Sequence, residues 1–160
     1  MSATDRRIED RDALQAAVSE LADAASRRIM LFVPDASDAA WSAPGVLAPL
    51  QRFATERRQR EVAWLFAHVD ALASDHAGLV TLSQRLPSLF PLRQADPDFA
   101  LPAAQGFIAN DAGGLLLLDS GERLAGTLAF AADRARPLAS RFDEAWQRAR
   151  PLSELRALGI

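Results

Sequence analysis

The stretch Arg28-Ile29-Met30-Leu31-Phe32-Val33-Pro34-Asp35 decides the fold. Its five central residues are all apolar, and the run is too short for a helix. A strand with one face in water would alternate apolar and polar residues, so this uninterrupted run predicts a strand that is buried on both faces. The stretch Val62-Ala63-Trp64-Leu65-Phe66-Ala67 has the same character and predicts a second such strand. Two strands of this kind are typical of the centre of a sheet with helices on both faces.

Segments with helical periodicity surround these two strands. They are expected at residues 12–28, 46–58, 74–86, 136–148 and 152–158. Proline is tolerated best in the first turn of a helix. Pro44 and Pro49 therefore limit where the second helix can begin, and Pro137 should lie in the first turn of the fourth helix or precede it. Ser74 or Asp75 is expected to cap the third helix.

Weaker patterns predict four more strands, at residues 89–93, 106–109, 115–118 and 124–130. The segment Asn110-Asp111-Ala112-Gly113-Gly114 between two of them is a strong hairpin signal. Alternating helices and strands followed by a hairpin predict a three-layer α/β domain, in which a mixed, largely parallel sheet has helices on both faces. We expect a single domain over residues 11–160, preceded by a flexible N-terminus at residues 1–10.

The composition excludes several classes of chemistry. The sequence has no cysteine, two histidines, and 18 basic residues that are all arginine. Thiolate sites, Schiff-base lysines and phosphate-binding loops with a lysine are therefore excluded. The arginines indicate either anion recognition or the codon bias of a GC-rich genome. No pattern implies a cofactor.

The charge and hydropathy patterns bear on partners and location. The net charge of −3 argues against binding of nucleic acid. We see neither a signal peptide nor an apolar run long enough to span a membrane, so we expect no membrane partner and a cytoplasmic protein.

Four segments of the chain resemble a known fold. They are residues 28–35, 62–70, 76–88 and 106–148, the third of which ends in Gln84-Arg85-Leu86-Pro87-Ser88. In order and spacing they resemble one half of the phospholipase D-like fold, and more closely a proteobacterial domain family of unknown function with that fold. The resemblance implies a sheet whose late hairpin begins at the catalytic motif of the superfamily.

That motif is His-x-Lys followed, after four intervening residues, by Asp, in which the histidine is the nucleophile and the lysine binds phosphate. Asp111 matches the aspartate, which puts the lysine position at Gly106 and the histidine position at Ala104. A shift by one residue gives Gln105 and Ala103 instead. Neither register supplies a nucleophile, so we expect no catalytic residue of this type and no enzyme of this class.

Polar side chains near strand ends are the remaining candidates for a site. Asp70 follows a buried strand and precedes His76 by six residues, which suggests a carboxylate–imidazole pair in a cleft. The alternative is a surface histidine in the first turn of a helix. Asp35 and Asp70, with Asp96 and Asp98 in a loop, suggest oxygen ligands for a divalent cation. The alternative for these aspartates is ordinary turn chemistry.

These observations leave three hypotheses for function. The first is a non-catalytic phospholipase D-like domain that binds a ligand or a protein partner. The second is a divalent-metal or His/Asp-dependent hydrolase that acts on a phosphoester. The third is an accessory domain that modulates a partner enzyme such as an acyltransferase, and it rests on resemblance alone. The candidate ligand-binding residues are Asp35, Asp70, His76, Gln105, Asn110 and Asp111.

The run Leu115-Leu116-Leu117-Leu118 bears on oligomeric state. Four large apolar side chains in one strand need cover on both faces. The helix at 136–148 can cover one face, and the other needs a helix of this chain or a second copy. Catalytic members of the phospholipase D superfamily, which the chain resembles, place two halves face to face, and this chain supplies one. We therefore expect a homodimer formed through the hairpin face.

Overall fold

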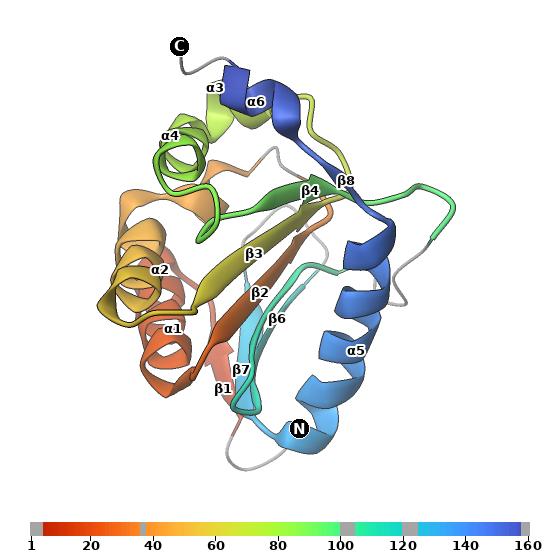
Figure 1. Cartoon of the computed structure of the whole chain (residues 1–160). Coiled ribbons are helices and arrows are strands. Elements are labelled where there is room, and N and C mark those ends of the chain that lie inside the picture. Colours follow the sequence, from red (N-terminus) through yellow and green to blue (C-terminus); the bar gives the residue numbers. More distant parts are fainter. Residues whose placement is uncertain (1–4, 36–37, 100–104, 120–124, 158–160) are drawn as a thin grey trace.

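The computed structural model describes residues 5–35, 38–99, 105–119 and 125–157. They form one eight-stranded sheet with the strand order β1-β7-β6-β5-β2-β3-β4-β8 and helices on both faces (Figure 1). The strands are β1 (Arg6–Ile8), β2 (Arg28–Val33), β3 (Glu61–Phe66), β4 (Leu92–Gln94), β5 (Phe107–Asn110), β6 (Gly114–Leu118), β7 (Gly126–Phe130) and β8 (Arg150–Pro151). The helices are α1 (Arg11–Ala24), η1 (Ala39–Ser42), α2 (Pro44–Glu56), α3 (Leu72–Asp75), α4 (Ala77–Arg85), α5 (Ala132–Arg148) and α6 (Ser153–Ala157).

The two apolar runs form the central strands, as the sequence predicts. β2 and β3 pair in parallel from Arg28↔Glu61 to Val33↔Phe66. Residues 29–33 and 62–66 are all buried. The mixed α/β class and the helices on both faces are therefore confirmed.

The prediction of a largely parallel sheet is wrong. β2–β3 and β3–β4 are the parallel pairs, whereas the other five pairs of neighbouring strands are antiparallel. Short connections between β5, β6 and β7 allow only antiparallel pairing, because a parallel pair needs a long crossover. β5 then joins β2 in the antiparallel sense, and the short edge strands β1 and β8 do the same at the two edges.

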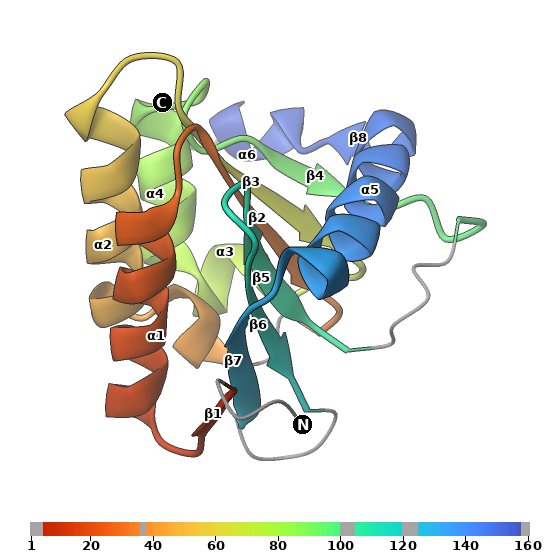
Figure 2. The same cartoon turned by 90° about the horizontal axis from the view of Figure 1, so that it is seen from below.

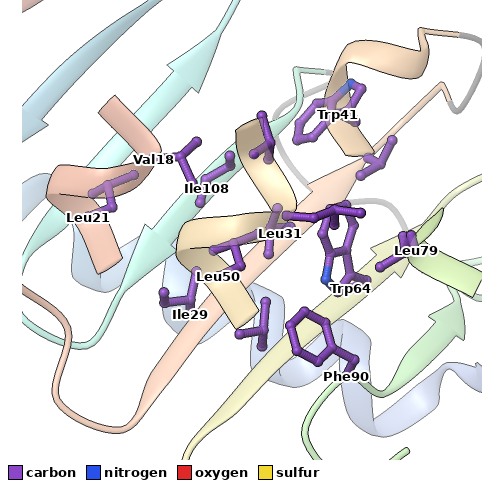
Figure 3. Packing of buried hydrophobic residues seen from close by; sticks show 14 of the residues in the cluster. Val18, Leu21, Ile29, Leu31, Trp41, Leu50, Trp64, Leu79, Phe90 and Ile108 are labelled. Atoms are coloured by element: carbon purple, nitrogen blue, oxygen red, sulfur yellow. The ribbon is translucent and has the colours of Figure 1, made fainter. Parts of the chain in front are cut away.

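Helices of this chain cover both faces of the sheet (Figure 2). α1, α2 and α4 lie on one face, where Ile29, Leu31 and Trp64 belong to the larger core cluster (Figure 3). α5 lies on the other face and packs its Phe142 with Met30 and other residues of the smaller cluster. Because successive side chains of β2 point to opposite faces of the sheet, β2 contributes residues to both clusters.

The run 115–118 is covered on both faces by these same helices. Leu116 and Leu118 belong to the cluster under α1, while Leu115 and Leu117 pack in the cluster under α5. No second copy is needed to bury this strand, so the expected homodimer loses the support that the four leucines gave it.

Two prolines lie deeper in helices than the sequence predicts. α2 begins at Pro44 but continues through Pro49, and α5 begins at Ala132, five residues before Pro137. A proline at the sixth helical position removes the bond to the carbonyl four residues earlier. For Pro137 that carbonyl belongs to Asp133, an exposed residue of the first turn, where water can satisfy it.

The helix expected from Ser74 or Asp75 is in fact two helices. α3 and α4 meet at His76, which has φ −124° and ψ 38° and forms no side-chain cap. At the start of the chain, the strand β1 pairs with β7 and buries Ile8. The division into a flexible N-terminus and one domain stays a prediction. No helix in the described ranges has the length and apolar character that crossing a membrane requires.

Candidate functional site

The candidate residues divide between opposite ends of the sheet. Asp35 and Asp70 follow the carboxyl ends of β2 and β3. Gln105 precedes β5, and the pairing Phe32↔Phe107 brings the start of β5 to this same end. The pairing Ile29↔Asn110 instead brings the end of β5, and Asp111 after it, beside the start of β2. Six residues of strand separate the two ends by on the order of 15–20 Å, so the six candidates do not form one site.

Asn110 and Asp111 are both occupied by backbone groups. The buried Asn110 amide donates to the Leu21 carbonyl (2.9 Å), and its oxygen accepts from the N–H groups of Ala112 (2.9 Å) and Gly114 (2.7 Å). These bonds close the hairpin and tie it to the end of α1.

The Asp111 carboxylate accepts from the backbone N–H groups of Ser26 and Arg27, at 2.8 Å each. It therefore fixes the connection between α1 and β2. The position that matches the family's aspartate thus carries a structural carboxylate in this chain.

His76 has a partner that the sequence does not suggest. Its side chain is buried, and its Nδ1 lies 2.6 Å from the Oγ of Ser42, which is also buried. The imidazole also meets the edge of the Phe66 ring, with 6.4 Å between centroids. Asp70 is exposed and forms no hydrogen bond or ion pair with any described residue, so the predicted Asp70–His76 pair does not form.

The surface-histidine alternative is also wrong, because only 1% of His76 is exposed. The break between α3 and α4 turns the imidazole into the core, and η1 brings Ser42 to it from 34 residues away. No signal in the sequence links these two positions.

The start of β5 is closed by an aromatic ring. A Cβ atom added at Gly106 would lie 2.5 Å from Cζ2 and 2.7 Å from Cη2 of Trp41, and 3.1 Å from the carbonyl oxygen of Phe32. Trp41 is itself buried, and it lies in η1, whose first turn is capped by the Asp38 carboxylate. Figure 3 shows Trp41 among the buried residues of the larger cluster. The position that the resemblance assigns to a phosphate-binding lysine is therefore a packing position. Ala103 and Ala104 lie outside the described residues.

The aspartates after β4 have the turn chemistry that the sequence allows. The Asp96 carboxylate accepts the backbone N–H of Asp98 (3.0 Å), and the Asp96 carbonyl accepts that of Phe99 (3.0 Å). Among the described residues, no group of three or more His, Cys, Asp or Glu side chains could hold a metal ion. The hypothesis of a cation site at Asp35, Asp70, Asp96 and Asp98 gains no support there.

Solved structures share this architecture at low sequence identity. Nuc from Salmonella typhimurium, a phospholipase D family member, is 14% identical, with a TM-score of 0.62 over 92% of this chain and 96% of its own. NucT from Helicobacter pylori is 9% identical, with a TM-score of 0.67 over 92% and 98%. TrmBL2, an archaeal chromatin protein with a novel mode of DNA binding, is 10% identical, with a TM-score of 0.62 over 93% of this chain and 54% of its own.

At these identities the likeness establishes the fold alone, and the fold is phospholipase D-like. No curated protein matches the sequence significantly. The model of a family described as a domain of unknown function, DUF7931, matches residues 10–158. That match spans nearly the whole chain, which therefore belongs to the DUF7931 family.

Proposed function

We propose that this chain is a phospholipase D-like domain that does not hydrolyse phosphodiesters and that acts as a protein-interaction module, as a homodimer. The observation that carries the first part is the Trp41 ring over Gly106. A phosphate-binding side chain at position 106, immediately before β5, would need the space that this ring fills. The sequence also contains no lysine with which to bind phosphate there.

The other polar groups of the fold do not replace the missing motif. Ser42 and His76 resemble a nucleophile and its base, but 8% and 1% of these residues are exposed, so a substrate would reach them only after the core opened. Asn110 and Asp111 already serve backbone groups. A hydrolase would thus have to assemble its site from exposed, unconnected carboxylates such as Asp70.

The likeness of this chain to Nuc and NucT supports the proposed homodimer. The chain covers 96–98% of Nuc and NucT, so its extent is similar to that of these two chains. Catalytic members of the resembling family place two such units face to face. Loss of the chemistry removes no apolar surface, so the contact can persist without it. The contact lies away from Leu115–Leu118, whose faces are covered within the chain.

Two readouts on one purified preparation test this proposal. We expect no turnover of bis(p-nitrophenyl) phosphate above buffer, with or without added divalent cation. Turnover that disappears in both His76→Ala and Asp70→Ala would contradict the non-catalytic function. By sedimentation equilibrium we expect a mass twice the 17.3 kDa of one chain. A mass of 17.3 kDa at every concentration would overturn the homodimer and leave the first readout intact.

A further inference from the structure

A hollow of ≈ 330 Å³ lies at the end of the sheet opposite Trp41. It opens where β2 and β3 begin, beside the loop that joins α2 to β3. Its lining residues are Arg27, Arg28, Gln59, Arg60, Glu61 and Ser88. Three arginines and one glutamate therefore line one small hollow.

Arg60 is held in place by the ends of two other elements. Its Nε donates to the Ser26 carbonyl (2.9 Å), its Nη1 donates to the Phe53 carbonyl (3.0 Å), and its guanidinium lies 4.4 Å from the centroid of the Phe53 ring. These bonds use two of the five N–H donors of the side chain. The nearest carboxylate oxygen, from the largely exposed Glu56, is 3.9 Å from Nη1. Arg60 thus keeps spare donors on a fixed side chain, which lowers the entropy lost on binding an anion.

The positive charge of the hollow comes from Arg27 and Arg60. Arg28 is neutralised, because its Nε lies 2.8 Å from Glu61 Oε1 and its Nη1 pairs with Asp143. The Arg27 side chain is exposed and forms no hydrogen bond or ion pair with any described residue. Its backbone N–H is fixed at 2.8 Å by Asp111. An exposed guanidinium on a fixed backbone therefore belongs to the same lining as the fixed side chain of Arg60.

The backbone of the loop is strained beside Arg60. Gln59 has φ 60°, the only positive φ of a non-glycine residue in the described parts of the chain. A glycine would adopt this conformation freely, whereas a glutamine is strained in it. Strain of this kind persists where the surroundings hold it, and it is enriched at ligand-binding positions. Arg57 and Arg58 precede Gln59 in the same loop and add positive charge nearby.

We infer that this hollow binds a small phosphate-bearing anion. Forked guanidinium groups match the geometry of phosphate oxygens, and the Ser88 hydroxyl offers one more donor. The volume lies at the small end of the range for ligand pockets, roughly 300–1,000 Å³. The net charge of −3 disfavours a long polyanion, which would also meet the acidic remainder of the surface. The site lies at the opposite end of the sheet from the start of β5, so it stands independently of the proposed function.

Titration of the full chain with inorganic pyrophosphate tests the inference, followed by ¹⁵N–¹H NMR spectra and by calorimetry at low ionic strength. We expect saturable shifts of the backbone amides of Arg27, Gln59, Arg60 and Ser88. Arg27→Gln should weaken binding by about tenfold. The matched control is Arg136→Gln, which removes the same charge from an exposed arginine on α5 and should change the affinity by about twofold at most.

Three results would overturn the inference. The first is an absence of saturable shifts at these amides. The second is an equal loss of affinity in Arg27→Gln and Arg136→Gln, which would show a general charge effect. The third is binding of a single-stranded oligonucleotide that is tighter than pyrophosphate binding and rises with oligonucleotide length, which would assign the hollow to a nucleic-acid backbone.

Discussion

Replacement of Gly106 by alanine should destabilise the protein by overpacking the start of β5. The added Cβ would lie 2.5 Å from Trp41 Cζ2 and 3.1 Å from the Phe32 carbonyl oxygen. Neither neighbour can yield easily, because Trp41 is buried and Phe32 belongs to a central strand. Overpacking of this kind costs about 1–3 kcal/mol. Alanine also reduces the conformational entropy of the unfolded chain, which offsets about 0.4–1 kcal/mol of this cost. The expected net loss in the free energy of unfolding is therefore about 1–2 kcal/mol.

Gly78→Ala provides the matched control for this change. Gly78 is exposed near the start of α4, and a Cβ there would meet Leu47 Cδ1 at 3.5 Å, an ordinary contact. Because alanine favours the helix more than glycine does, this variant should be unchanged or more stable by up to about 1 kcal/mol. Both variants are measured by urea unfolding followed by far-ultraviolet circular dichroism.

A double-mutant cycle assigns the loss to the Trp41 ring. Trp41→Leu removes the two ring atoms that the new Cβ would approach most closely, so Gly106→Ala should cost less in that background. The expected coupling is about 1–2 kcal/mol, within the range for residues in contact. An equal cost of Gly106→Ala in both backgrounds, or no cost in the wild type, would refute the packing argument.

Three further changes test the other assignments, each by the same unfolding measurement. Asn110→Ala removes three hydrogen bonds and leaves the buried N–H of Gly114 without its side-chain acceptor, so we expect a loss of about 2–4 kcal/mol; a near-neutral result would argue against the structural role. Ser42→Ala breaks the buried contact with His76 and should cost about 1–3 kcal/mol, and stability equal to the wild type would show that this contact contributes nothing. Asp70→Ala alters an exposed side chain and should change stability by less than about 0.5 kcal/mol, whereas a larger loss would reveal a partner for this carboxylate.

The central strands were accessible from sequence because their pattern has one physical explanation. Five or six consecutive apolar residues fit a strand with both faces covered, and β2 and β3 have this environment. The hairpin between β5 and β6 was equally accessible, since Asn110 and the glycines after it suit a tight turn.

Strand direction was not accessible in the same way. An apolar run has the same pattern whether its strand pairs in parallel or antiparallel. The pairing of β5 with β2 also joins segments about 80 residues apart, so no local pattern shows it. The break at His76 was hidden for a related reason. Leu79 and Leu82 continue a helical pattern, and nothing in the local sequence indicates that the side chain of His76 turns into the core.

The candidate site shows where strand-end reasoning fails. It assumes parallel strands, whose carboxyl ends meet at one edge. Because β5 is antiparallel to β2, Asn110 and Asp111 lie at the opposite end of the sheet. There their side chains are hydrogen-bonded to backbone N–H groups. The partner of His76 could not be found either, since Ser42 reaches it from a 3-10 turn with no sequence signature.

Closure of the start of β5 by the Trp41 ring is tested most directly by an NMR titration. Bis(p-nitrophenyl) phosphate is added to the ¹⁵N-labelled chain, and the signals of the Gln105 and Gly106 amides and the Trp41 indole N–H are followed. The packing of Trp41 on Gly106 predicts that these three signals do not move, whatever occurs at the Arg27 end of the sheet. Saturable shifts of the Gly106 amide together with the Trp41 indole would contradict the claim, because they would show that a phosphodiester enters the space that the ring fills.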